Sequence, residues 1–145
     1  MKKFIVLLSV FAMLISCQQE TSQAKEDYDK TLKEVFAYHD EAMPKMGDIA
    51  NLIDNIEKKT ILDAEQPDEE LLKAKERLKN AHEHMMTWMK DFSENFPDVH
   101  TEKDLSEEEW RKEKKKLKPE IISAKKMRDD VFESVAHAKK VLGED

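Results

Sequence analysis

Histidine and methionine side chains gather in two short stretches of this chain. Residues 82–89 read HEHMMTWM and residues 39–46 read HDEAMPKM. In both stretches a histidine is followed by methionines four and seven positions later. Thioether sulfur and imidazole nitrogen are ligands that suit Cu(I), so the spacing raises the hypothesis of a soft-metal site. Its candidate ligands are His39, Met43, Met46, His82, Met86 and Met89.

Core packing is the alternative interpretation of the same residues, and we take it as the default. Methionine fills irregular gaps in helical cores, above all where a proline such as Pro44 disturbs regular packing. A middle helix that contacts two neighbours also needs a wide apolar stripe, which Met85, Met86, Trp88 and Met89 could supply. Under this interpretation the histidines and methionines are buried and matter through stability. His84 falls on another side of the helix.

The apolar residues that surround these stretches recur with helical periods. Leu71, Leu78, Met85 and Phe92 follow one another at intervals of seven. Such coiled-coil-like spacing is expected where helices pack nearly parallel. A third segment continues the pattern with Trp110, Leu117, Ile121, Ala124, Val131, Val135, Ala138 and Leu142. Only two glycines and 39% charged residues also favour long helices with few turns.

Two breaks divide the helical pattern into three parts. AEQPDEE ends the first part, and ENFPDVHTEKD separates the second from the third, where Ser106 has the features of an N-cap. We expect helices near 24–63, 68–94 and 105–142. Short connections make neighbouring helices antiparallel, so the predicted fold is an all-α, up-down-up bundle of three long helices.

Two prolines, Pro44 and Pro119, fall inside the predicted helices. Each removes a backbone hydrogen bond, but the apolar register continues through both, so we expect kinks on outer faces. The alternative is a true break at Pro44–Asp48 in which Asp48 caps a new helix, which would give a four-helix bundle.

The first residues have the features of a bacterial lipoprotein signal. Lys2 and Lys3 precede the apolar run FIVLLSVFAMLI, and LISC follows at 14–17. LISC resembles the lipobox, which implies that Cys17 is lipidated and becomes the first mature residue; an ordinary signal peptide is the alternative. Cys17 is the only cysteine in the chain. We therefore expect a signal peptide at 1–16, a lipidated Cys17 with a polar tether at 17–26, and a helical body at 27–143.

The composition argues against several classes of function. The net charge of −7 disfavours nucleic acid as a partner. Two glycines leave little room for a phosphate-binding loop, and the lipid would occupy the single thiol, so we do not expect an enzyme. We do not expect covalent haem either, because the chain lacks a C-x-x-C-H motif. Further apolar surface, on Trp110, Phe96 and Phe132, could belong to the contact of a homo-oligomer as easily as to the core.

Two stretches, HDEAMPKMGDI at 39–49 and MMTWMKDF at 85–92, resemble a group of small envelope lipoproteins of Bacteroidota. Some members of that group carry the label "viral A-type inclusion protein". The resemblance covers most of residues 30–142 and implies an envelope lipoprotein with a helical-bundle body. It brings no catalytic residues, because the group has no established activity.

These observations give two hypotheses for function. The first is a membrane-anchored lipoprotein with a structural or protein-interaction role in the cell envelope. Residue 18 is glutamine and not the aspartate that retains some lipoproteins at the inner membrane, so we expect the outer membrane, with the body facing either the periplasm or the cell surface. The second is a Cu(I)-binding envelope lipoprotein that uses the histidines and methionines above.

Overall fold

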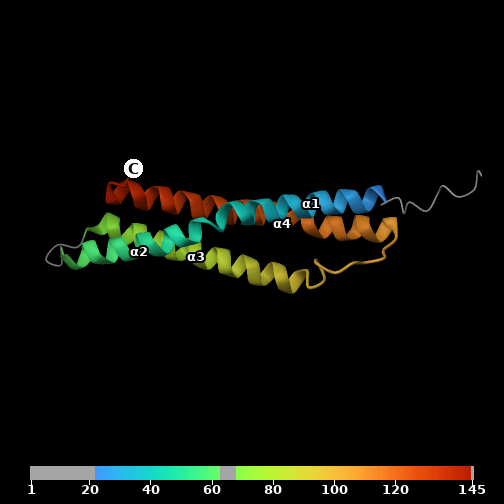
Figure 1. The fold of residues 1–145 in the computed structure, drawn as a ribbon, viewed down its shortest axis with the longest axis horizontal. Coiled ribbons are helices and arrows are strands. Elements are labelled where there is room, and N and C mark those ends of the chain that lie inside the picture. Colours follow the sequence, from blue (N-terminus) through green and yellow to red (C-terminus); the bar gives the residue numbers. More distant parts are fainter. Residues whose placement is uncertain (1–21, 63–67, 145) are drawn as a thin grey trace, which may run out of the picture.

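The computed structural model describes residues 22–62 and 68–144, and within these ranges the chain is almost entirely helical. The helices are α1 (Gln23–Ala42), α2 (Lys45–Leu62), α3 (Glu69–Asn95) and α4 (Glu107–Leu142). α1 and α2 follow one another as a single bent arm, so the molecule is a bundle of three arms (Figure 1). The predicted all-α bundle is thus confirmed.

The first arm is interrupted at Pro44. Met43 keeps helical dihedral angles, and the Met46 amide donates to the Met43 carbonyl at 3.1 Å. Pro44 has no amide hydrogen, so the regular ladder stops there and resumes at Lys45. The continuous helix predicted over 24–63 is therefore wrong at this point. Asp48 is not a cap either, because it lies in the first turn of α2 and pairs with Lys45 at 3.1 Å.

Side-chain caps fix the N-termini of α1, α3 and α4. Ser22 accepts from the Lys25 amide at 3.2 Å, so α1 begins at Gln23. Residues 23–26, expected in the tether, are therefore the first turn of α1. Asp68 caps α3, and Ser106 forms a reciprocal capping box with Glu109 at the start of α4, as predicted for Ser106.

α1 and α4 run parallel in a constant register. Asp27 pairs with Lys114 at 2.6 Å and Glu41 with Arg128 at 2.7 Å, and both pairs are separated by 87 residues in sequence. α3 runs the opposite way, since Glu57 of α2 meets Lys75 near the start of α3 at 2.8 Å, whereas His39 of α1 lies beside Trp88, further along α3. The bundle is therefore up-down-up. α4 is about 54 Å long at the usual helical rise and runs along most of the bundle, while the end of α2 reaches beyond its C-terminus (Figure 1).

The core follows the seams that the sequence indicates, with some differences. The four residues of α3 at intervals of seven are all buried. In α4 the seam also includes Met127, which is fully buried, whereas Ile121 and Leu142 are only partly buried. Trp110 and Phe96 belong to the core, but Phe132 is exposed. Both prolines lie on outer faces, as predicted, and α4 continues through Pro119.

None of the described helices has a stretch that is both long and apolar enough to span a bilayer. The predicted signal peptide and Cys17 lie outside the described residues.

Candidate functional site

The six candidate metal ligands lie where the first arm passes α3, and we call them the His–Met seam: His39, Met43, Met46, His82, Met86 and Met89. The His39 ring centroid lies 5.8 Å from that of Trp88, which fixes the level at which α1 meets α3. Because the two arms are antiparallel, Met43, one turn past His39, comes level with residue 84, and Met86 lies at a level between His39 and Met43. Met46 and His82 follow one turn further along.

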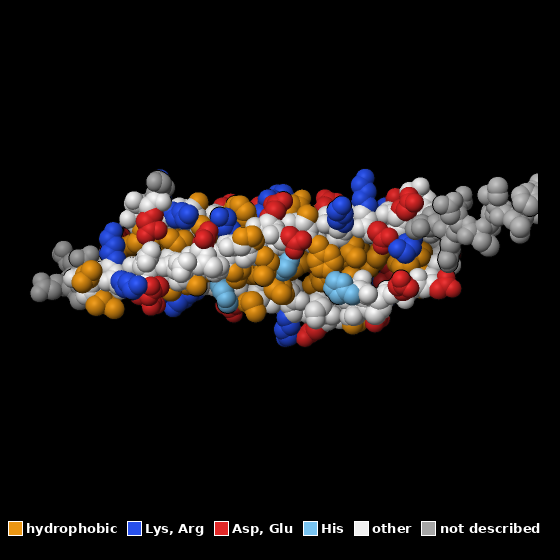
Figure 2. Space-filling model, in the orientation of Figure 1, with side chains coloured by type: hydrophobic (Ala, Val, Ile, Leu, Met, Phe, Trp, Pro, Cys, Tyr) orange, Lys and Arg blue, Asp and Glu red, His pale blue; other side chains and the backbone are white. Residues whose placement is uncertain are grey.

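Most of the seam is exposed, which contradicts the packing interpretation for these residues. The side chains of Met43, Met86 and Met89 are 44%, 52% and 39% exposed. His82 is also exposed, while His39 and Met46 are half-buried. Figure 2 shows histidine side chains beside hydrophobic ones in the middle part of this face.

The buried stripe of α3 is correspondingly narrower than predicted. Met85 and Trp88 are buried, whereas Met86 and Met89 are not. α3 packs most closely on α4, less closely on α2, and reaches α1 only through large side chains. Its edge toward the first arm is therefore left partly uncovered.

His39 is held by its neighbours in a definite orientation. Its Nδ1 lies 3.0 Å from a carboxylate oxygen of Asp40, and its ring packs near the Trp88 indole. When Nδ1 carries the proton and donates it to Asp40, Nε2 keeps a free lone pair, as a metal-binding imidazole requires. The indole nitrogen of Trp88 is buried without a hydrogen bond of good geometry among the described residues.

His84 belongs to a different contact, as the sequence predicts. Its Nδ1 lies 2.7 Å from a carboxylate oxygen of Asp130 in α4. It therefore links α3 to α4 and is separate from the His–Met seam.

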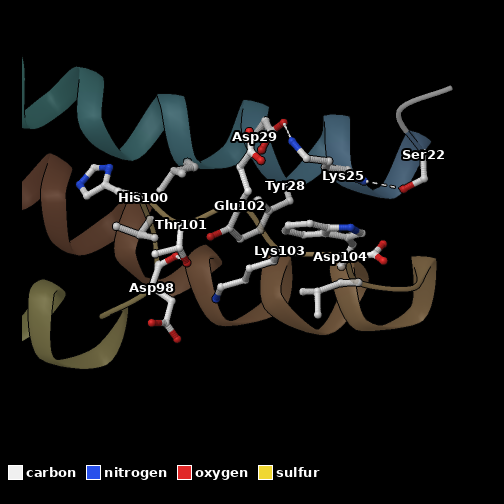
Figure 3. Close-up of a pocket in the computed structure, with 14 residues that line it drawn as sticks. Ser22, Lys25, Tyr28, Asp29, Asp98, His100, Thr101, Glu102, Lys103 and Asp104 are labelled. Atoms are coloured by element: carbon white, nitrogen blue, oxygen red, sulfur yellow. Dashed lines mark hydrogen bonds and ion pairs between the residues drawn. The ribbon is translucent and has the colours of Figure 1, made fainter. Parts of the chain in front are cut away.

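A second feature is a groove of about 830 Å³ at the end of the bundle where α1 begins. It lies between the first turns of α1 and the connection 98–105, with Trp110 of α4 in its wall (Figure 3). Tyr28 and Trp110 are both buried, and their ring centroids lie 5.0 Å apart. α3 ends before this level, so here the connection is the third layer that covers α1 and α4.

Charged groups of both signs line this groove. Lys25 pairs with Asp29 at 2.7 Å and lies 5.6 Å from the Trp110 ring centroid. Burial raises the pKa of Tyr28, and the negative charges of Glu113 and Asp29 add to that effect, so the phenol stays protonated at neutral pH. The groove can therefore offer a neutral phenol and carboxylates to a polar ligand.

Sequence reasoning missed this groove. The only signals for it are two aromatic residues near the ends of predicted helices, Tyr28 and Trp110, and the long charged connection between the second and third helices.

Within the described ranges, no three His, Cys, Asp or Glu side chains come together as they would around a metal ion. No known family model, curated protein or solved structure matches this chain.

Proposed function

We propose that this protein is a bacterial lipoprotein that is anchored to a membrane through Cys17 and presents a rigid helical body to another component of the cell envelope. The observation that carries the anchor is the stretch LISC at 14–17, which contains the only cysteine of the chain, and the first cap, Ser22, follows five residues after Cys17. Five extended residues reach at most about 17 Å. An anchor at Cys17 would therefore hold the α1 end of the bundle close to the lipid surface.

The shape of the body supports a role in interaction. The groove and the start of α1 lie at one end, and the α2–α3 hairpin lies at the other end (Figure 1). The last turn of α2 exposes Ile61 and Leu62, at 73% and 84%. An anchored body would present these apolar side chains away from the membrane, where a partner protein could contact them. The proposed role is not catalytic.

Acylation at Cys17 is tested directly by labelling. Cells that express the full chain are fed a palmitate analogue, and labelled protein is followed by gel and by membrane fractionation. We expect label and membrane association for the parent and for the control Gln18→Ala, and neither label nor processing for Cys17→Ser. Label that persists in Cys17→Ser would refute the proposed anchor, and co-sedimentation with the outer membrane would support the expected location.

The interaction role is tested with a photo-crosslinking amino acid at Ile61, with Glu76 as an exposed control position on α3. We expect a discrete adduct in cells from position 61 and none from position 76. Equal, diffuse adducts from both positions would contradict a partner at the tip of the hairpin.

A further inference from the structure

We propose that the His–Met seam binds one Cu(I) ion between α1 and α3, with His39, Met43, Met86 and Met89 as its ligands. This inference is independent of the anchor, because all four residues belong to the folded body.

The helical spacing places the four ligands in two adjacent pairs. His39 in α1 and Met43, the C-cap of α1 with helical dihedral angles, are four residues apart, and Met86 and Met89 are three apart on α3, so each pair shares one helix face. The contact between His39 and Trp88 brings the two faces to the same level. Methionine side chains are long and unbranched, so thioethers from both arms can converge on an ion between them.

Exposure distinguishes this set from packing residues. The core methionines Met85 and Met127 are fully buried, whereas Met43, Met86 and Met89 keep 39% to 52% of their surface in solvent. Such half-exposed side chains contribute less through burial than the two core methionines do. Their exposed surface also leaves them open to an ion that arrives from another molecule.

Asp40 is a positioning residue for the imidazole ligand. Its carboxylate contacts Nδ1 of His39 at 3.0 Å and favours the tautomer that leaves Nε2 free. The half-buried ring is also restrained by Trp88 on its other side.

The ligand chemistry selects the metal. Thioethers are soft ligands that suit Cu(I), whereas Mg²⁺ and Ca²⁺ require oxygen. Met46 and His82 lie one turn further along and are not required in this ligand set. Ag(I) has similar softness and does not change its oxidation state in air, so it is a convenient first probe.

The test uses the full chain in detergent, with methyl-¹³C methionine, titrated with Ag(I) and then anaerobically with Cu(I). We expect the methyl signals of Met43, Met86 and Met89 to shift and to saturate at one equivalent. The signals of Met85 and Met127 should move little. Shifts that are absent, or that are spread equally over all the methionines, would overturn the proposal.

Affinity is then measured by competition with a chromogenic Cu(I) chelator. Met43→Leu/Met86→Leu/Met89→Leu removes three sulfur atoms while it keeps apolar side chains of similar volume at exposed positions, so folding should be preserved. We expect at least a tenfold loss of affinity in this variant, none in the control Met85→Leu, and an intermediate loss in His39→Ala. Equal affinity in the triple variant and the control would overturn the ligand set. Failure of the parent to hold Cu(I) against the chelator would overturn the site and leave the seam as a surface for a protein partner.

Discussion

Adjacent methionines on α3 should respond very differently to truncation. Met85 is fully buried in the core, and Met86 is 52% exposed at the His–Met seam. Truncation of a buried methionine to alanine removes apolar contacts and leaves a cavity, at a cost of about 2–5 kcal/mol. The neighbours of Met85 in the core belong to long helices that cannot easily collapse into the space, so we expect about 3 kcal/mol for Met85→Ala.

The same substitution at Met86 should cost about 1 kcal/mol or less, because about half of its surface stays in solvent and no closed cavity is left. Urea unfolding followed by circular dichroism measures both variants against the parent, with equal m-values as a check that the transitions are comparable. Similar losses from the two variants, or a larger loss from Met86→Ala, would refute the assignment of Met85 to the core and of Met86 to the surface.

Three further predictions concern the helix cap, the α1–α4 interface and a half-buried carboxyl. Ser106→Ala removes the capping box of α4 and should lower the free energy of unfolding, measured with urea, by about 1 kcal/mol. The control Ser93→Ala, at an exposed position inside α3, should lower it much less. Equal effects of the two substitutions would contradict a capping role for Ser106. Arg128 pairs with Glu41 and lies over the rings of Tyr38 and Phe132, at 5.1 Å and 5.9 Å. Arg128→Lys keeps the charge but loses the planar guanidinium group, so we expect the free energy of unfolding to fall by roughly 1 kcal/mol. The control Lys125→Arg should leave it unchanged. An unchanged midpoint of urea unfolding for Arg128→Lys would contradict the stacking on the two rings. Burial raises the pKa of Glu120 above its ordinary value of 4.5, more than the Trp88 indole lowers it. The folded protein then binds this proton more tightly than the unfolded chain, so its contribution to stability is present below pH 4.5 and is lost as the pH rises through the raised value. A pH series of urea titrations should show that Glu120→Gln removes this part of the slope, and an identical slope in the variant would contradict the assignment.

The helices of the second and third arms could be predicted because their apolar spacing is regular. In α3 the residues at intervals of seven, from Leu71 to Phe92, are all in the core. The start of α4 was predictable for a local reason, since Ser106 and the acidic residues after it satisfy the first amide groups of the helix.

The start of the first arm and its break at Pro44 were less predictable, because both depend on individual hydrogen bonds. Ser22 forms the first cap, so the helix extends back into a polar segment whose composition indicated a tether. At Pro44 the apolar pattern continues, but the hydrogen-bond ladder does not. Periodicity reports which residues face the core and says little about one missing hydrogen bond.

The exposure of the His–Met seam could not be predicted, because it depends on how the arms share their contacts. A middle helix covered equally by both neighbours would bury Met86 and Met89 along with Met85. In the structure α1 packs most closely on α4, and α3 reaches α1 only through large aromatic groups such as Phe92. The edge of α3 beyond these groups remains open to solvent.

Pro44 and the exposed thioethers have a common structural origin. Up to Ala42 the first arm packs against α4, and after Lys45 it divides its contacts between α3 and α4. The change of partner occurs where Pro44 removes the backbone hydrogen bond that would keep the helix regular. Met43 lies directly before this point, within one turn of the level of Met86, where neither α1 nor α2 covers α3 completely. A site for a soft ion at this level would therefore use a gap that the proline itself helps to create.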